Sequence, residues 1–167
     1  MYFSRPGENY YNGGRRTLQT GNTAVLARML VDRLGCAVHE LEASEPYPSG
    51  YDAAVARNVT EQQNDSRPAI AGPPPSFDGY STVLLGSPIW NVRPPMIMNT
   101  FVEGIDWTGK TQYPFVTYAV SGLGRTVSVY ERAARRAQIG DGLAVRGEEV
   151  AGAGDQAAAW LRSISLL

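Results

Sequence analysis

The chain has 167 residues, which is the size of one ordinary domain. Its 43% hydrophobic and 19% charged residues are typical of a folded protein that buries a core without disulfide or metal staples. The formal net charge of −1 gives no strong field, which argues against a nucleic-acid groove. The single Cys36 excludes an internal disulfide, and with only one His39 it excludes a zinc site built from several such ligands. Redox chemistry would therefore need a borrowed cofactor.

The N-terminal residues lack the apolar stretch of a secretory signal, which predicts a cytoplasmic protein. No apolar run approaches the roughly 18 residues that a membrane span requires. We therefore expect no membrane span and no nucleic-acid partner.

Short apolar runs alternate with longer amphipathic stretches along the chain. The apolar runs predict strands at 1–4, 37–41, 82–87, 113–118 and 139–145. The amphipathic stretches predict helices at 23–34, 51–64, 95–103, 126–137 and 155–164. This alternation is typical of a parallel sheet covered by helices on both faces, with 82–85 at its centre. The first strand is shorter than the usual five or six residues, so either the start lies upstream or the strand is short.

The loop after the first strand carries groups that suit a phosphate. It begins with Ser4 and Arg5 and resumes, after an insertion, with Gly21, Asn22 and Thr23 at the start of a helix. Hydroxyls and free backbone amides at a helix N-terminus bind an anion without a lysine. The alternative is that these residues only cap the helix.

Two later strand-to-helix loops each carry an aromatic residue, together with asparagine or glycine residues that tolerate positive φ. The loop from Pro88 through Ile89, Trp90 and Asn91 offers a flat indole for a ring ligand, although Trp90 could equally close the core. The loop 117–125 begins with Thr117 and Tyr118 and continues to Ser121, Gly122 and Gly124. Because it lacks the third glycine of a dinucleotide fingerprint, we do not interpret it as an NAD site.

The remaining polar residues give no acid, base or nucleophile set. His39 is alone in a predicted strand, and Ser121 lacks both a nucleophile-elbow pattern and a positioned base. Chemistry would therefore belong to a bound cofactor.

Taken together and in order, these segments resemble a flavodoxin-like protein. The matching segments are Tyr2-Phe3-Ser4-Arg5, Gly21-Asn22-Thr23, Gly86-Ser87-Pro88-Ile89-Trp90, Gly109-Lys110-Thr111 with Pro114-Phe115, and Ser121-Gly122-Leu123-Gly124. The resemblance implies one domain over 1–167, an α/β three-layer sandwich whose five-stranded parallel sheet has the order 2-1-3-4-5, and FMN as cofactor.

By match to the family's loops, the resemblance implies three sets of cofactor contacts. Ser4, Arg5, Gly21, Asn22 and Thr23 would hold the phosphate, and the ring would lie between the other two loops. The ring set comprises Pro88, Ile89, Trp90, Asn91, Thr117, Tyr118, Ser121, Gly122 and Gly124.

This sequence departs from the family pattern at 8–19, which interrupts the phosphate loop. We interpret this insertion as a mobile surface excursion, with the alternative that Arg15 or Arg16 folds over the phosphate. Arg93 and Arg125 in the ring loops predict a flavin potential less negative than that of an acidic carrier.

The function implied is that of an FMN-dependent electron carrier between redox protein partners. Two alternatives remain. One is an NAD(P)H-dependent FMN oxidoreductase that reduces a quinone or a similar acceptor, and the other is a flavodoxin-fold binding domain that has lost FMN.

Overall fold

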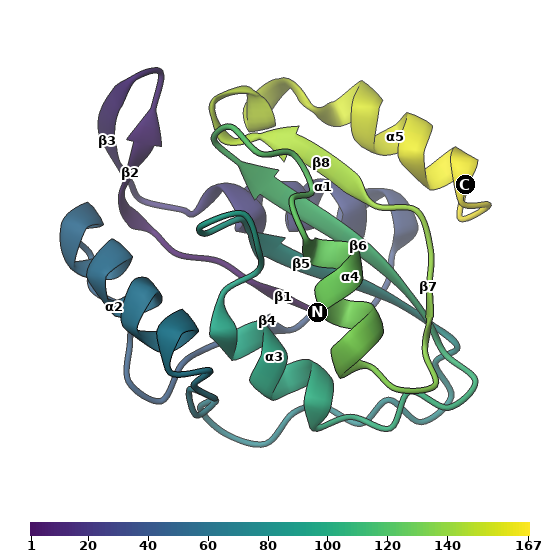
Figure 1. Ribbon diagram of the computed structural model, residues 1–167. Helices are drawn as coiled ribbons and strands as arrows, with labels where there is room; N and C mark the ends of the chain where they lie inside the picture. The colour runs from purple at the N-terminus through teal and green to yellow at the C-terminus, as the bar shows by residue number, and fades with distance from the viewer.

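The computed structural model describes residues 1–167 as a parallel sheet with helices on both faces (Figure 1). The strands are β1 (Tyr2–Phe3), β2 (Gly7–Tyr11), β3 (Gly14–Leu18), β4 (Glu40–Leu41), β5 (Thr82–Pro88), β6 (Thr111–Tyr118), β7 (Gln138–Ile139) and β8 (Leu143–Arg146). The helices are α1 (Asn22–Leu34), α2 (Tyr51–Gln63), α3 (Met96–Glu103), α4 (Thr126–Ala133), the 3-10 helix η1 (Gly147–Gly152) and α5 (Gly154–Ser163).

The central sheet has the order β4-β1-β5-β6, followed at the edge by β7 and β8. Both edge strands pair with β6 in parallel, β7 at Thr111–Gln112 and β8 at Phe115–Tyr118. They therefore occupy one position in the sheet, which the chain crosses with a break at 140–142. The predicted order 2-1-3-4-5 and the three-layer class are confirmed, while the expected single last strand is two short ones.

Strands β1 and β4 are shorter than predicted. β1 consists of Tyr2 and Phe3, and β4 of Glu40 and Leu41.

Helix α4 ends four residues before the predicted boundary. Arg136 adopts a positive φ of 75°, which turns the chain so that Gln138 can pair with Thr111 on β6.

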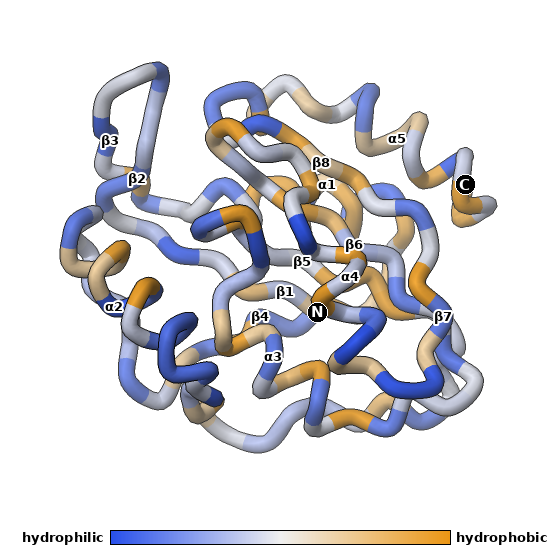
Figure 2. Tube along the Cα trace, viewed as in Figure 1, coloured by the Kyte–Doolittle hydropathy of each residue, from blue (hydrophilic) through white to orange (hydrophobic).

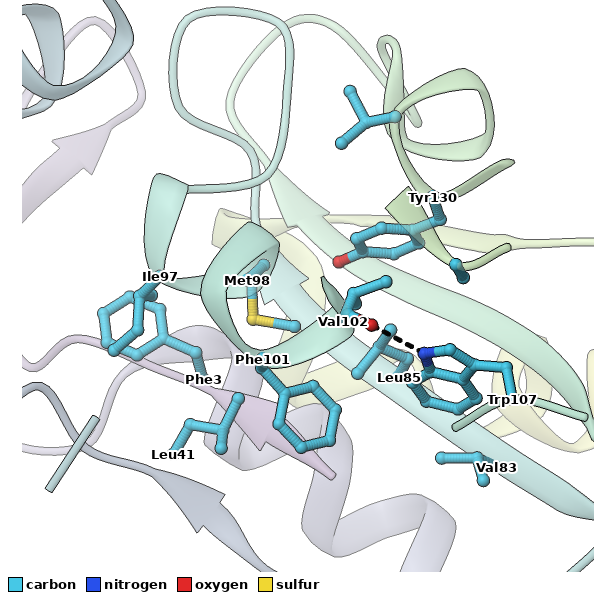
Figure 3. Packing of buried hydrophobic residues seen from close by; sticks show 12 residues of the cluster. Phe3, Leu41, Val83, Leu85, Ile97, Met98, Phe101, Val102, Trp107 and Tyr130 are labelled. Atoms are coloured by element: carbon cyan, nitrogen blue, oxygen red, sulfur yellow. Dashed lines mark hydrogen bonds between the residues drawn. The ribbon is translucent and has the colours of Figure 1, made fainter. Parts of the chain in front are cut away.

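The sheet separates two hydrophobic clusters. Val83 and Leu85 of β5 point to the face covered by α3 and α4, whereas Leu84 packs toward the face covered by α1 and α5. This alternation follows from the two-residue period of a strand. Figure 3 shows the first cluster, in which the Nε1 of the buried Trp107 donates to the carbonyl of Val102 at 2.7 Å. Trp107 is thus a core residue.

The 8–19 insertion contains an ordered β-hairpin, not a mobile excursion. β2 and β3 pair antiparallel across a two-residue turn, in which Asn12 and Gly13 have positive φ values of 47° and 82°. Asn-Gly is the preferred sequence for such a turn because both positions tolerate positive φ. Figure 2 shows the hairpin as mostly hydrophilic, in contrast to the hydrophobic segments around β6 and β8. The hairpin therefore projects from the sheet rather than adding to its core.

No helix of this chain combines the length and the apolar character that crossing a membrane demands.

Candidate functional site

A polar cleft lies at the carboxyl ends of β1, β5, β6 and β8, where ligands of open parallel sheets bind. Its volume is about 100 Å³. It is lined by Ser4, Arg5, Asn9, Tyr10, Asn22, Thr23, Tyr51, Pro88, Ile89, Trp90, Thr117, Tyr118, Ala119, Gly147 and Glu148. The cleft thus combines the first strand-to-helix loop, the two later loops and the inserted hairpin.

The N-terminus of α1, of which Asn22 and Thr23 line the cleft, has unpaired backbone amides. The N–H groups of Thr20, Gly21, Asn22 and Thr23 donate to no other group of the protein, and Gly21 provides no side-chain cap. Only the next amide, that of Ala24, is satisfied from outside the helix, by the hydroxyl of Ser4 at 3.1 Å. Unpaired amides together with the positive end of the helix dipole can bind an anion.

Close approach of the chain at two glycines shapes this anion site. A Cβ on Gly21 would lie 2.3 Å from the Ser4 Oγ and 2.7 Å from the Arg5 carbonyl oxygen. A Cβ on Gly147 would lie 2.4 Å from the Asn22 Nδ2. A larger residue at position 21 would push the backbone of the first loop away, and one at position 147 would displace the Asn22 side chain. Gly21 therefore acts by allowing the loop to close, although it does not itself line the cleft.

The floor of the cleft is a buried hydroxyl pair. The Oγ1 atoms of Thr23 on α1 and Thr117 at the end of β6 lie 2.7 Å apart, and the two residues are 1% and 4% exposed. The pair joins the start of α1 to the end of β6.

Arg5 lines the cleft, but its guanidinium is engaged elsewhere. Its Nη1 donates to the carbonyls of Pro48 and Ser49 at 2.9 and 3.0 Å, and its Nη2 donates to the carbonyl of Glu8. Burial lowers the pKa of Arg5, and its Nε is buried without a partner. Arg5 thus clamps the segment before α2 to the base of the hairpin, and its Nε is left buried without an acceptor.

The aromatic residues that line the cleft are Tyr10, Tyr51, Trp90 and Tyr118. The half-buried Trp90 packs edge-on against Phe3 and Tyr47, with ring centroids 5.7 and 5.1 Å away. Tyr47 is fixed in turn by its hydroxyl, which donates to Glu61 at 2.8 Å, and burial together with this bond raises the pKa of Tyr47. Trp90 is therefore held in place by packing and also lines the cleft.

Tyr118 also lines the cleft, and the guanidinium of Arg146 lies 5.9 Å from its ring centroid. Arg146 comes from the end of β8 and was not among the predicted site residues.

The turn after Trp90 is strained and contacts the loop after β6. Asn91 and Val92 have positive φ values of 50° and 63°, and the backbones of Trp90 and Arg93 pair across the turn. The carbonyl of Val92 accepts from the amide of Arg125 at 2.8 Å. Positive φ is costly for a β-branched residue, so this interloop contact holds a conformation that Val92 alone would not adopt.

Gly124 is required for the same contact, because its φ is 51° and a Cβ there would lie 2.3 Å from the Val92 carbonyl oxygen. Asn91 points its amide to Gln62 at 2.8 Å. Neither residue lines the cleft, and neither do Ser121 and Gly122.

The hairpin covers one side of the cleft through Asn9 and Tyr10. Its turn is tied across to η1, because the amide of Asn12 donates to the carboxylate of Glu148 at 3.0 Å. Arg15 faces α2 instead of the cleft, with two hydrogen bonds to Asp52 at 2.6 and 2.9 Å, and Arg16 stacks on Tyr11. The structure thus places neither Arg15 nor Arg16 in the lining of the cleft, and a role for either at a phosphate stays a prediction.

The cleft brings together nine of the fourteen predicted contact residues. Those that line it are Ser4, Arg5, Asn22, Thr23, Pro88, Ile89, Trp90, Thr117 and Tyr118. Gly21, Asn91, Ser121, Gly122 and Gly124 lie in the same loops but outside the cleft. The lining residues that we did not predict are Asn9, Tyr10, Tyr51, Ala119, Gly147 and Glu148.

A signal for part of the unpredicted set was present in the sequence. Gly147 and Glu148 follow the last strand, and the carboxyl end of that strand must reach the same edge of the sheet.

The doubly wound sheet and the amide-lined cleft define a flavodoxin-like α/β protein. The family model described as Flavodoxin matches residues 17–164, and the chain therefore belongs to the flavodoxin family. No match to the chain is found among curated proteins.

Solved structures with this fold include three flavoproteins or flavoprotein candidates. A candidate from Bacteroides eggerthii is 27% identical, with a TM-score of 0.76 over 98% of this chain and 94% of its own. A candidate from Bacteroides uniformis is 24% identical, with a TM-score of 0.76 over 96% and 94%. A flavoprotein from Lactobacillus acidophilus in complex with FMN is 17% identical, with a TM-score of 0.62 over 94% and 95%. The last two show similarity of fold alone.

Proposed function

We propose that this chain binds FMN and carries electrons between redox partners. The observation that supports this most directly is the set of unpaired amides at the N-terminus of α1, at the carboxyl edge of the sheet. These amides suit a phosphate dianion, and they need no lysine.

The other groups of the cleft match the remaining parts of FMN. The Oε2 of Glu148 is buried and has no partner, so it can accept a hydrogen bond from a hydroxyl such as those of the ribityl chain. Trp90 and Tyr118 supply flat apolar surface for the isoalloxazine. The volume of about 100 Å³ is below the roughly 300–1,000 Å³ of a pocket for a whole ligand. The cleft therefore suits the phosphate end, and we propose the ring at its mouth.

FMN would supply the transfer of one or two electrons, while the chain would bind and orient it. Glu148 is the only carboxylate that lines the cleft, no histidine or cysteine lies beside it, and no group of three metal-ligating side chains occurs in the structure. The protein part of the function is then to grip the phosphate, to hold Trp90 and Tyr118 at the ring and to expose the ring edge to a partner.

The test is titration of the folded apoprotein with FMN and with riboflavin, followed by flavin fluorescence. We expect FMN to bind at least about 100-fold more tightly than riboflavin, because several charge-assisted hydrogen bonds of about 1.5–3 kcal/mol each are lost without the phosphate. Trp90→Leu should weaken FMN by about 3- to 10-fold, and Tyr80→Leu, at an exposed tyrosine outside the cleft, should not. Equal affinity for both flavins would refute the phosphate site.

Direct assays distinguish the proposed carrier from its alternatives. A carrier should be reduced by a chemical mediator and reoxidised without consuming NAD(P)H on its own. Steady oxidation of NAD(P)H by the FMN-loaded protein would instead identify an oxidoreductase. Absence of FMN binding to the folded chain would identify a domain that has lost its cofactor.

A further inference from the structure

A second polar cleft, of about 330 Å³, lies on the face of the sheet covered by α3 and α4. Its lining residues are Asp65, Arg67, Arg93, Asn99, Glu103, Arg125, Val129, Arg132 and Ala133. It shares no residue with the cofactor cleft. Arg93 and Arg125, which we expected to act at the flavin ring, thus point their side chains into a separate site.

Arg67 pairs with both of the carboxylates that line this cleft. The carboxylate of Asp65 lies 2.8 Å from the Nη1 of Arg67, and that of Glu103 lies 2.6 Å from its Nε. The hydrogen bonds to Arg67 also lower the pKa of both carboxyl groups, so both are ionised at neutral pH. Arg93, Arg125 and Arg132 take part in no ion pair.

Arg93 is the most recessed of the three unpaired arginines. Its Nη2 donates to the Oδ1 of Asn99 at 2.7 Å, but its Nε is buried and has no partner. Burial and then the neighbouring charge of Arg125 lower the pKa of Arg93. A buried donor without an acceptor destabilises the fold, and an anion at this position would satisfy it.

Arg125 and Arg132 place two further guanidinium groups at the same cleft from helix α4. Arg125 is the residue before α4 and is exposed, and its side chain makes no hydrogen bond in the structure. Arg132 is also exposed and uses only its Nε, which donates to the carbonyl of Ser128. Several N–H donors of the three arginines are therefore free and border one hollow.

We propose that this cleft binds a phosphate or diphosphate group of a small molecule. Arginine guanidinium groups match the geometry of phosphate oxygens and form paired hydrogen bonds with them. A hollow with a recessed cation favours a compact anion over the flat acidic surface of a protein. The chain's net charge of −1 also provides no extended basic face for a nucleic acid. The proposed site rests on these arginines alone and does not depend on FMN binding.

The experiment measures the binding of inorganic pyrophosphate by isothermal titration at constant ionic strength. Arg125→Gln and Arg132→Gln are the test variants. Arg135→Gln is the matched control, because Arg135 is exposed, lies three residues beyond Arg132 and does not line the cleft. Each titration is run with and without saturating FMN, so that ligand in the cofactor cleft is distinguished from ligand in the arginine cleft.

We expect saturable binding that persists with FMN present, weakened at least about 10-fold by each test variant and less than about 2-fold by the control. Parallel titrations with phosphate, ADP and NADPH distinguish a free diphosphate from one carried by a nucleotide. Three results would overturn the proposal: no saturable binding, an equal loss in Arg135→Gln, or displacement of pyrophosphate by FMN. Binding of an acidic peptide but not of pyrophosphate would also overturn it.

Discussion

Replacement of Gly21 by alanine tests whether close packing forms the anion site. The backbone of Gly21 has φ −65° and ψ 148°, which alanine adopts without strain, so the cost is steric. The new Cβ would lie 2.3 Å from the Ser4 Oγ and 2.7 Å from the Arg5 carbonyl oxygen. The Ser4 side chain could rotate away only by giving up its bond to the Ala24 amide, but the Arg5 carbonyl belongs to the backbone and would have to move.

The magnitude follows from these two contacts. Overpacking in a closely packed site costs about 1–3 kcal/mol, and loss of the hydrogen bond to Ser4 costs about 1 kcal/mol. We therefore expect Gly21→Ala to lower the free energy of unfolding by about 2–4 kcal/mol beyond any general effect of alanine. At about 2–4 °C per kcal/mol for a chain of this size, the melting temperature should fall by about 4–16 °C.

Gly50→Ala is a closely matched control. Gly50 precedes α2 as Gly21 precedes α1, with φ −76° and ψ 142°, but no atom lies within 4 Å of its Cβ position. Both variants thus change the helix cap and the unfolded state in the same way. Urea unfolding followed by circular dichroism gives the difference between them. If the two variants agree within about 0.5 kcal/mol, the steric account of the phosphate loop is refuted.

Three further predictions concern the turn, the hydroxyl pair and pH. Val92→Gly should raise the free energy of unfolding by up to about 1 kcal/mol, measured in urea. The strain of a positive φ at valine is larger than the entropic cost of ordering a glycine. A loss of stability would contradict the interpretation that Val92 is strained. Thr23→Val should cost about 1–3 kcal/mol by leaving the Thr117 hydroxyl unpaired, and the double variant with Thr117→Val should recover part of this loss; additive losses would contradict coupling. Arg67 lowers the pKa of Glu103, so their pairing stabilises the fold above the ordinary carboxyl pKa of 4.5 and loses this effect as pH falls below it. The stability difference between the wild type and Arg67→Gln should therefore shrink from pH 6 to pH 3, and a constant difference would contradict the linkage.

The parallel sheet and the edge that carries the site could be predicted from the sequence, whereas the strand order came from the resemblance to flavodoxin-like proteins. The alternation of apolar runs and helical periodicity specifies a parallel sheet, and a parallel sheet places its loops at one edge. The loops at Ser4, Trp90 and Thr117 follow from that rule, and the structure places all three in one cleft.

The contacts that decide the role of single side chains could not be predicted in this way. Arg5 is bound by carbonyls of Glu8, Pro48 and Ser49, and two of these lie more than forty residues along the chain. The wrong prediction for residues 8–19 has a different cause. Asn12 followed by Gly13 between two short runs is a local signal for a tight turn. The length of the insertion suggested an excursion, whereas the preferred turn sequence should have indicated an ordered pair of strands.

The brevity of β1 has a consequence for the order in which the molecule opens. β5 and β6 share seven register pairs, whereas β1 meets β5 at the single pair Tyr2↔Gly86 and meets β4 at two. In native-state hydrogen exchange, the amides of this central seam should exchange through partial openings well below the global unfolding free energy. Since Ser4 follows directly on that seam, a ligand held in the first loop should slow exchange at Tyr2 and Phe3 while leaving β6 unchanged.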